Sequence, residues 1–387
     1  MVIPWRCKVR NTNIEISKGK IMTQSSKRID SVDAGAGIMI LWMIIYHAIS
    51  FSLNIQLLEY EGALDVNSIP KNLHVLVGKN GQLIPKNACV IFPYLNFFMP
   101  WFFYKSGQFF VKREMRELWK KDVSKLLTPF LIWSLIGYVM YLLFHAITHT
   151  LTWENSTIHI ASALFKSGSI PLNLPLWFLT TLFGVRLVAN LCITTNNTYT
   201  GWLRLIAIIV LGYTIAFLAH VLHNKFLPEW VANSASGLVF FAMGYGLKEH
   251  EHKTWLFLPC LQVYLICVFV GFPIVDMHSN SLLAGCFWAW IPVAICSIVA
   301  FNNVCAIICK FFRLTVLLWI GRHSMQIFIS HFLILYTIDF VIRYFELVQL
   351  RPYSLWLMIG AYTLILPICC MCINSSGRIR IAMCRDE

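Results

Sequence analysis

Charged residues are scarce in this chain. They make up 13% of its 387 residues, and the acidic ones are the rarer, with 18 Asp and Glu against 31 Lys and Arg. A soluble domain of this length carries roughly a quarter charged residues. Hydrophobic residues reach 58% and fall in long blocks, and about 20 apolar residues suffice to cross a bilayer. The composition therefore excludes an ordinary soluble protein and predicts an all-α integral membrane protein.

The start of the chain lacks the apolar core of a secretory signal peptide. Residues 1–27 are polar and basic, and we expect them to form a disordered cytoplasmic tail. Met22 opens a stretch that is typical of a natural start, so residues 1–21 are a candidate start-site extension.

Cysteine and histidine do not indicate a disulfide framework or a metal site. Most of the 13 cysteines lie inside apolar blocks, which favours small core residues. The run "EHEH" at 249–252 has the residue types of metal ligands, but neighbours in a short basic loop do not converge on one ion. We expect a solvated loop there and no metal.

Ten apolar segments have the composition of transmembrane helices. We place them at about 34–53, 88–110, 126–147, 175–195, 203–223, 231–247, 254–275, 281–301, 321–345 and 353–373. The apolar run "LTVLLWI" before the ninth segment indicates a lead-in helix in the membrane interface. The sequence thus predicts one membrane domain over residues 28–373, a bundle of about ten transmembrane helices, followed by a cytoplasmic tail at 374–387.

The basic residues predict the orientation. The net charge of +13 is concentrated in the two tails and in short loops that fall on one side of the membrane if ten spans alternate. Cytoplasmic loops carry such an excess of Lys and Arg. We therefore expect both termini in the cytoplasm and the long loops at 54–87 and 148–174 outside. The same distribution argues against a nucleic-acid partner.

Ionisable side chains inside the predicted spans are costly and mark candidate sites. His47 can serve as a general base near neutral pH or simply join two helices by a hydrogen bond. For His331 the choice is the same, and helix packing is somewhat favoured. Arg186 is expected to pair with a buried carboxylate or to contact an anion. Lys105 is expected either to belong to a site or to extend its ammonium into cytoplasmic water (snorkelling). The histidines near outer span ends are typical of the membrane interface: His145, His220 and His223.

Five segments show a distinctive order of features. They are "RIDSVDAGAGIMILWMIIYHA" at 28–48, "FFMPWFFYKSGQFF" at 97–110, "LLTPFLIWSL" at 126–135, "PLWFLTTLFGVRL" at 175–187 and "IGRHSMQIFISHFLIL" at 320–335. The first joins an inner aspartate to an outer histidine, and the last contains a serine and a histidine. The small residues "GAG" at 35–37 permit close helix approach. In this order the segments resemble the acyltransferase family 3 membrane proteins, especially the fucose 4-O-acetylase-like branch.

The resemblance implies transfer of an acyl group, usually acetyl, from cytoplasmic acyl-CoA to a hydroxyl of an extracytoplasmic or lipid-linked glycan. It implies a ten-span bundle in the cytoplasmic membrane of a bacterium, and acetyl-CoA as a donor substrate without a tightly bound cofactor. His47 matches the catalytic histidine, and His331 is the second catalytic candidate. The substrate-binding candidates by motif position are Asp33, Lys105, Ser106, Arg186 and Ser324.

The first span departs from the family at one position. The family usually has Lys or Arg eleven residues before the histidine, where this chain has Ala36. By helix rise, position 36 lies about 16 Å from His47 toward the cytoplasm. Lys105 lies at a comparable depth on the antiparallel second span. One hypothesis is that Lys105 supplies the donor-binding charge that Ala36 lacks; the other is snorkelling into water.

These features favour O-acyl transfer in which His47 takes the hydroxyl proton. The developing oxyanion needs a donor or a cation, and Ser106, His331 and Arg186 are the candidates. A transporter or flippase for a glycan lipid is the main alternative, although no internal repeat typical of transporters is visible. Because Ala36 replaces the usual basic residue, a third interpretation remains, in which the protein is a non-catalytic scaffold of a polysaccharide-synthesis complex.

Overall fold

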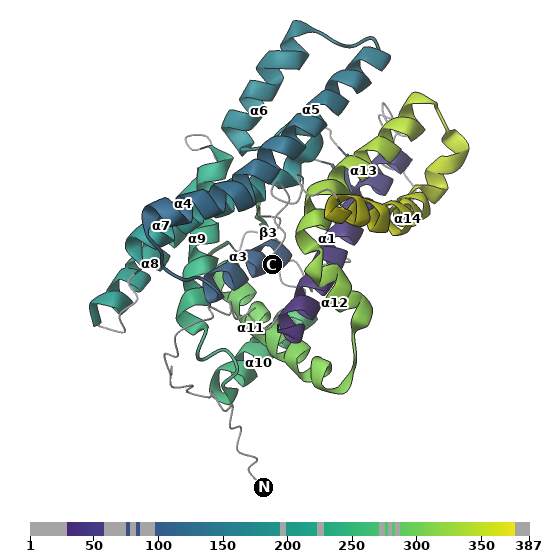
Figure 1. Cartoon of the computed structure of the whole chain (residues 1–387). Coiled ribbons are helices and arrows are strands. Elements are labelled where there is room, and N and C mark those ends of the chain that lie inside the picture. The colour runs from purple at the N-terminus through teal and green to yellow at the C-terminus, as the bar shows by residue number, and fades with distance from the viewer. Residues whose placement is uncertain are drawn as a thin grey trace, which may run out of the picture.

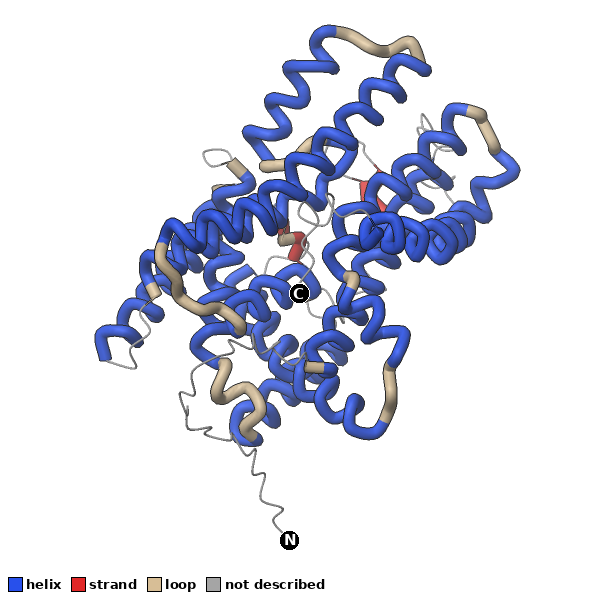
Figure 2. Tube along the Cα trace, in the orientation of Figure 1, coloured by secondary structure: helices blue, strands red, loops and turns tan. Residues whose placement is uncertain are grey.

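The computed structural model describes residues 29–57, 75–77, 83–85, 97–193, 199–222, 228–270, 275–277, 281–282 and 287–375. The predicted start-site extension, most of both tails, and His223 lie outside these residues. Figures 1 and 2 show an almost wholly helical protein with two very short antiparallel hairpins.

The helices follow the apolar segments. Their bounds are α1 Asp30–Leu57, α3 Phe98–Gln108, α4 Met115–Asp122, α5 Thr128–Ile147, α6 His159–Ser167, α7 Trp177–Cys192, α8 Tyr199–Val221, α9 Glu229–Leu247, α10 Thr254–Val270, α11 Phe287–Phe311, α12 Thr315–Arg322, α13 Ser324–Tyr344 and α14 Ser354–Ser375. The hairpins pair β1 (Val75–Val77) with β2 (Leu83–Pro85), and β3 (Val275–Asp276) with β4 (Ser281–Leu282).

In the described part of the chain, four short segments between the α-helices are wound more tightly or more widely than an α-helix. π-helical segments occur at Val123–Leu127 (η4) and Glu154–Ile158 (η5), and 3-10 segments at Pro171–Leu176 (η6) and Val348–Tyr353 (η7). Through η4, α4 and α5 form one continuous helical run over Met115–Ile147.

The membrane character of the chain is confirmed. Within the described residues, six helical runs are long and apolar enough to cross a bilayer: Asp30–Ser52, Met115–Ile147, Ser156–Cys192, Tyr199–Ala219, Ala289–Phe311 and Ser324–Tyr344. Thr254–Val270 and Ser354–Ile365 are apolar but shorter. The protein is a multi-pass membrane protein by this criterion. Each of the ten predicted segments contains a helix, while a count of ten crossings stays a prediction.

Helix α3 is the clearest case of a segment that is too short to cross the membrane alone. It has 11 residues, which corresponds to about 16 Å of helix against the ~30 Å of a hydrocarbon core. It lies near the centre of the molecule in Figure 1 and packs against α9 and α1. Its Trp101, Phe103 and Tyr104 are among the largest fully buried side chains.

Glycines set the closest helix contacts. A Cβ at Gly107 would overlap the carbonyl oxygen of Phe241 on α9, and a Cβ at Gly244 would overlap that of Tyr104 on α3. At the other contact, a Cβ at Gly37 would overlap the Leu317 carbonyl oxygen of α12, and one at Gly321 the Asp33 carbonyl oxygen of α1. The expected close approach at 35–37 is therefore confirmed, as is a separate helix before α13.

Candidate active site

Two predicted catalytic residues lie side by side. Helices α1 and α13 pack together (Figure 1), and the rings of His47 and His331 are 5.3 Å apart between centroids, tilted by 36°. Phe332 meets the His47 ring edge to face at 5.4 Å. His331 is fully buried, whereas His47 is half-buried. Two histidines that lie far apart in the sequence thus form one pair, which we call the histidine pair.

The hydrogen bonding of His331 is asymmetric. Its Nδ1 lies 2.6 Å from the carbonyl oxygen of Phe328. Its Nε2 is buried and has no hydrogen-bond partner among the residues that the structure describes. Buried polar groups in proteins are nearly always paired, so the unpaired Nε2 makes His331 a candidate functional residue.

Ser106 and Arg186, two predicted binding residues, are also in contact. Arg186 Nη1 donates to Ser106 Oγ at 3.3 Å, and Arg186 Nε donates to Asp122 Oδ2 at 2.7 Å. Asp122 is almost fully buried at the end of α4. Arg186 was expected to pair with a buried carboxylate or to contact an anion, and the structure shows the carboxylate, Asp122. Lys121 interacts electrostatically with Arg113, Lys125 and Arg186, so cations outnumber carboxylates in this cluster, where Asp122 pairs with Arg186 and Glu117 with Arg113.

Lys105 does not reach into water. Its side chain is 10% exposed, and its ammonium donates to Gln108 Oε1 at 2.7 Å and lies 3.5 Å from Glu251 Oε1. It also sits 5.8 Å from the centre of the Trp101 ring. The snorkelling alternative is therefore wrong. The ammonium has a buried counter-ion instead.

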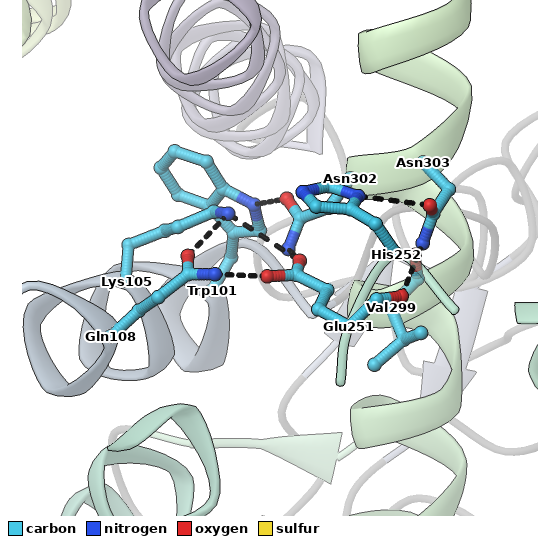
Figure 3. A network of polar contacts seen from close by, with 8 residues as sticks. All are labelled: Trp101, Lys105, Gln108, Glu251, His252, Val299, Asn302 and Asn303. Atoms are coloured by element: carbon cyan, nitrogen blue, oxygen red, sulfur yellow. Dashed lines mark hydrogen bonds and ion pairs between the residues drawn. The ribbon is translucent and has the colours of Figure 1, made fainter. Parts of the chain in front are cut away.

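Glu251 is the centre of this network, shown in Figure 3. Its side chain is fully buried, and its carboxylate also accepts hydrogen bonds from Gln108 Nε2 and Asn302 Nδ2. Trp101 Nε1 donates to Asn302 Oδ1 at 2.8 Å and so connects the network to α3. The expectation of a solvated loop at 249–252 is wrong for this residue, because the turn between α9 and α10 folds into the bundle.

The Glu251 and Lys105 pair gives a direct stability prediction. Removing one partner of a buried ion pair leaves an uncompensated charge and costs about 3–5 kcal/mol, whereas an apolar pair of similar volume is often neutral. We expect Lys105→Met to lower the unfolding temperature strongly and Lys105→Met with Glu251→Leu to recover much of it. Thermal unfolding of purified protein in detergent measures this. An exposed pair, Arg113 with Glu117, is the matched control; additive losses at Lys105 and Glu251 would contradict the buried pair.

The remaining two candidates lie at the start of α1 and of α13. Asp33 Oδ2 accepts from Arg322 Nε at 3.0 Å, and Asp30 Oδ1 accepts from Arg322 Nη2 at 3.3 Å. Ser324 is the first residue of α13, two positions after Arg322. A cation thus lies one helical turn from the buried Ala36, but it comes from α12 and is held by two aspartates.

The candidates form separate groups linked through aromatic packing. Phe178 of α7 meets Phe103 of α3 at 4.9 Å and Phe328 of α13 at 5.4 Å between ring centroids. The site includes residues that the sequence analysis did not select: Asp122, Glu251, Asn302 and Arg322. For Asp122, the signal was a single acidic residue in the basic run "WKKDVSK". Nothing in the sequence around Glu251 distinguished it from a surface acid.

The fold and the site define a multi-pass membrane protein with a histidine pair between α1 and α13 and with the cations Lys105, Arg186 and Arg322 paired to carboxylates. A family model described as an acyltransferase domain matches residues 29–373. The match covers most of the chain, so the protein belongs to this acyltransferase family and is a membrane acyltransferase by family. No curated protein and no solved structure matched the chain.

Proposed function

We propose that the protein transfers an acetyl or other small acyl group from acyl-CoA to a hydroxyl of a cell-surface or lipid-linked glycan. Family membership supports acyl transfer at a membrane. The observation that carries the proposal is the histidine pair, with His47 half-buried on α1 beside His331 on α13. A neutral imidazole at such a position is suited to take a proton from an alcohol near neutral pH.

His47 acts as the general base in this reaction. The hydroxyl oxygen attacks the thioester carbonyl carbon as its proton passes to His47, and the CoA thiolate then leaves and takes up that proton. Ser106 and Arg186 belong to a separate group on α3 and α7 and are candidates to bind the anionic part of the donor, because Arg186 has N–H groups beyond those used for Asp122 and Ser106. Asp33 and Ser324 belong to the donor side of the site at the starts of α1 and α13.

The donor enters from the cytoplasm in this proposal. A cluster of cations around α4, η4 and α7 favours an anionic donor such as acetyl-CoA: Arg113, Lys121, Lys125 and Arg186. That Lys105 helps to bind the donor stays a prediction, since Glu251 is the buried counter-ion of its ammonium. The protein has ten membrane crossings, with both termini cytoplasmic in a bacterial inner membrane, because the basic loops segregate to one side.

Acyl transfer in proteoliposomes tests the proposal. Protein in vesicles is given radiolabelled acetyl-CoA together with lipid-linked glycan, and the glycan is examined by mass spectrometry. We expect an added acetyl group on the glycan and release of free CoA in equal amounts. Movement of the glycan across the bilayer without covalent change would show a flippase. If the glycan is neither acetylated nor moved across the bilayer, the remaining interpretation is the non-catalytic scaffold that Ala36 suggested.

A further inference from the structure

The proton of His331 is fixed by its surroundings. A neutral imidazole carries one N–H and one lone pair, and a carbonyl oxygen can only accept. The 2.6 Å contact with the Phe328 carbonyl therefore places the proton on Nδ1 and the lone pair on Nε2. A second proton on Nε2 would create a buried donor without an acceptor among the described residues, which is costly. His331 consequently presents an acceptor, so it cannot act as the hydrogen-bond donor to an oxyanion.

The ring of His47 lies beside that of His331 and is the nearest candidate partner for this acceptor. The centroids of the His47 and His331 rings are 5.3 Å apart. A ring nitrogen lies about 1.2 Å from its ring centre, so at this separation two nitrogens that pointed toward each other would be about 3 Å apart, which is a hydrogen-bond distance. His331 is held in place by its hydrogen bond to the Phe328 carbonyl oxygen. Catalytic hydrogen bonds are often loose before substrate binds.

The different burial of the two histidines indicates different roles. His331 is fully buried and His47 is half-buried, so of the two rings His47 is the one that a substrate can reach. We propose, resting on the acyl transfer argued above, that His331 is a positioning residue whose Nε2 accepts a hydrogen bond from the ring N–H of His47. This bond fixes which nitrogen of His47 takes the hydroxyl proton and stabilises the His47 imidazolium until the CoA thiolate removes the proton.

Two variants of His331 separate this role from packing. His331→Phe retains an aromatic ring of similar size without nitrogen, and His331→Gln loses the ring but places an amide oxygen near the position of Nε2. Orienting a catalytic base is worth about 100-fold or more in rate. We expect His331→Phe to lower kcat by about 100-fold with little change in KM for acetyl-CoA, and His331→Gln to retain a substantial part of the activity. Near-wild-type turnover in His331→Phe, or equal loss in both variants, overturns the proposal.

A spectroscopic measurement tests the same inference without turnover. In ¹⁵N-histidine-labelled protein in lipid, the signals absent from His331→Gln identify His331. We expect a protonated Nδ1 and a hydrogen-bonded, unprotonated Nε2, with the second feature lost in His47→Ala. A protonated Nε2 overturns the assignment. If the wild-type protein transfers no acyl group, the proposed function fails, while this measurement still decides the pairing of the two histidines.

Discussion

Replacing His47 with alanine is expected to abolish acyl transfer while the protein still inserts and folds. His47 is the reachable member of the histidine pair and occupies the first-span position at which the family resemblance places the catalytic base. Loss of a general base lowers rates by about 10²- to 10⁴-fold. Release of CoA and acetylation of the glycan, measured in proteoliposomes at saturating acetyl-CoA, should both fall to background.

The control for this variant is His159→Ala. The His159 side chain is 55% exposed, lies within ion-pair distance of the exposed Glu154, and belongs to α6, which Figure 1 shows apart from α1 and α13. The His159→Ala substitution removes a histidine and leaves the histidine pair unchanged, so we expect wild-type turnover. Size-exclusion profiles of both variants in detergent should match the wild type. A His47→Ala protein that acetylates at the wild-type rate would reduce His47 to a helix-packing residue.

Sequence patterns predicted the helices because burial in a bilayer leaves a strong local signal. Each predicted apolar segment contains a helix, and of the small residues at 35–37, Gly37 lies where α1 meets α12 and Gly35 lies against Trp101 of α3. The limit is visible in α3, whose 11 helical residues are fewer than the predicted span 88–110, of which residues 88–96 lie outside the described residues. Hydropathy gives the position of a helix but not the share of it that crosses the membrane.

The ion pairs were beyond the reach of sequence patterns. Arg186 and Lys105 stood out as costly charges in apolar surroundings, but their partners are fixed by packing between distant segments. Asp122 reaches Arg186 from the α4 end, and Glu251 reaches Lys105 from the turn after α9. A loop composition such as that of 249–252 predicts exposure on average, and the tertiary fold reversed it for Glu251. The histidine pair shows the same limit, since each ring was a candidate and only the fold joined them.

The packing of α3 on α9 predicts a large loss of stability from adding one methyl group. Gly107 and Gly244 bring the two backbones so close that a Cβ at either would overlap a carbonyl oxygen of the other helix. Overpacking costs about 1–3 kcal/mol where side chains can move aside. Here the obstacle is backbone, so Gly107→Ala should reach the upper end of that range and displace α3, which carries Lys105 and Ser106.

Gly360→Ala provides the matched control. Gly360 lies within α14, and a Cβ there would have no described heavy atom within 4 Å. Alanine is preferred to glycine inside a helix by roughly 0.5–1 kcal/mol, so this variant should be as stable as the wild type or slightly more stable. Thermal unfolding in detergent, followed by tryptophan fluorescence, compares the two. Because displacement of α3 also separates Ser106 from Arg186, Gly107→Ala should lose acyl transfer together with stability. Equal unfolding temperatures for Gly107→Ala and Gly360→Ala would mean that α3 and α9 do not pack backbone to backbone.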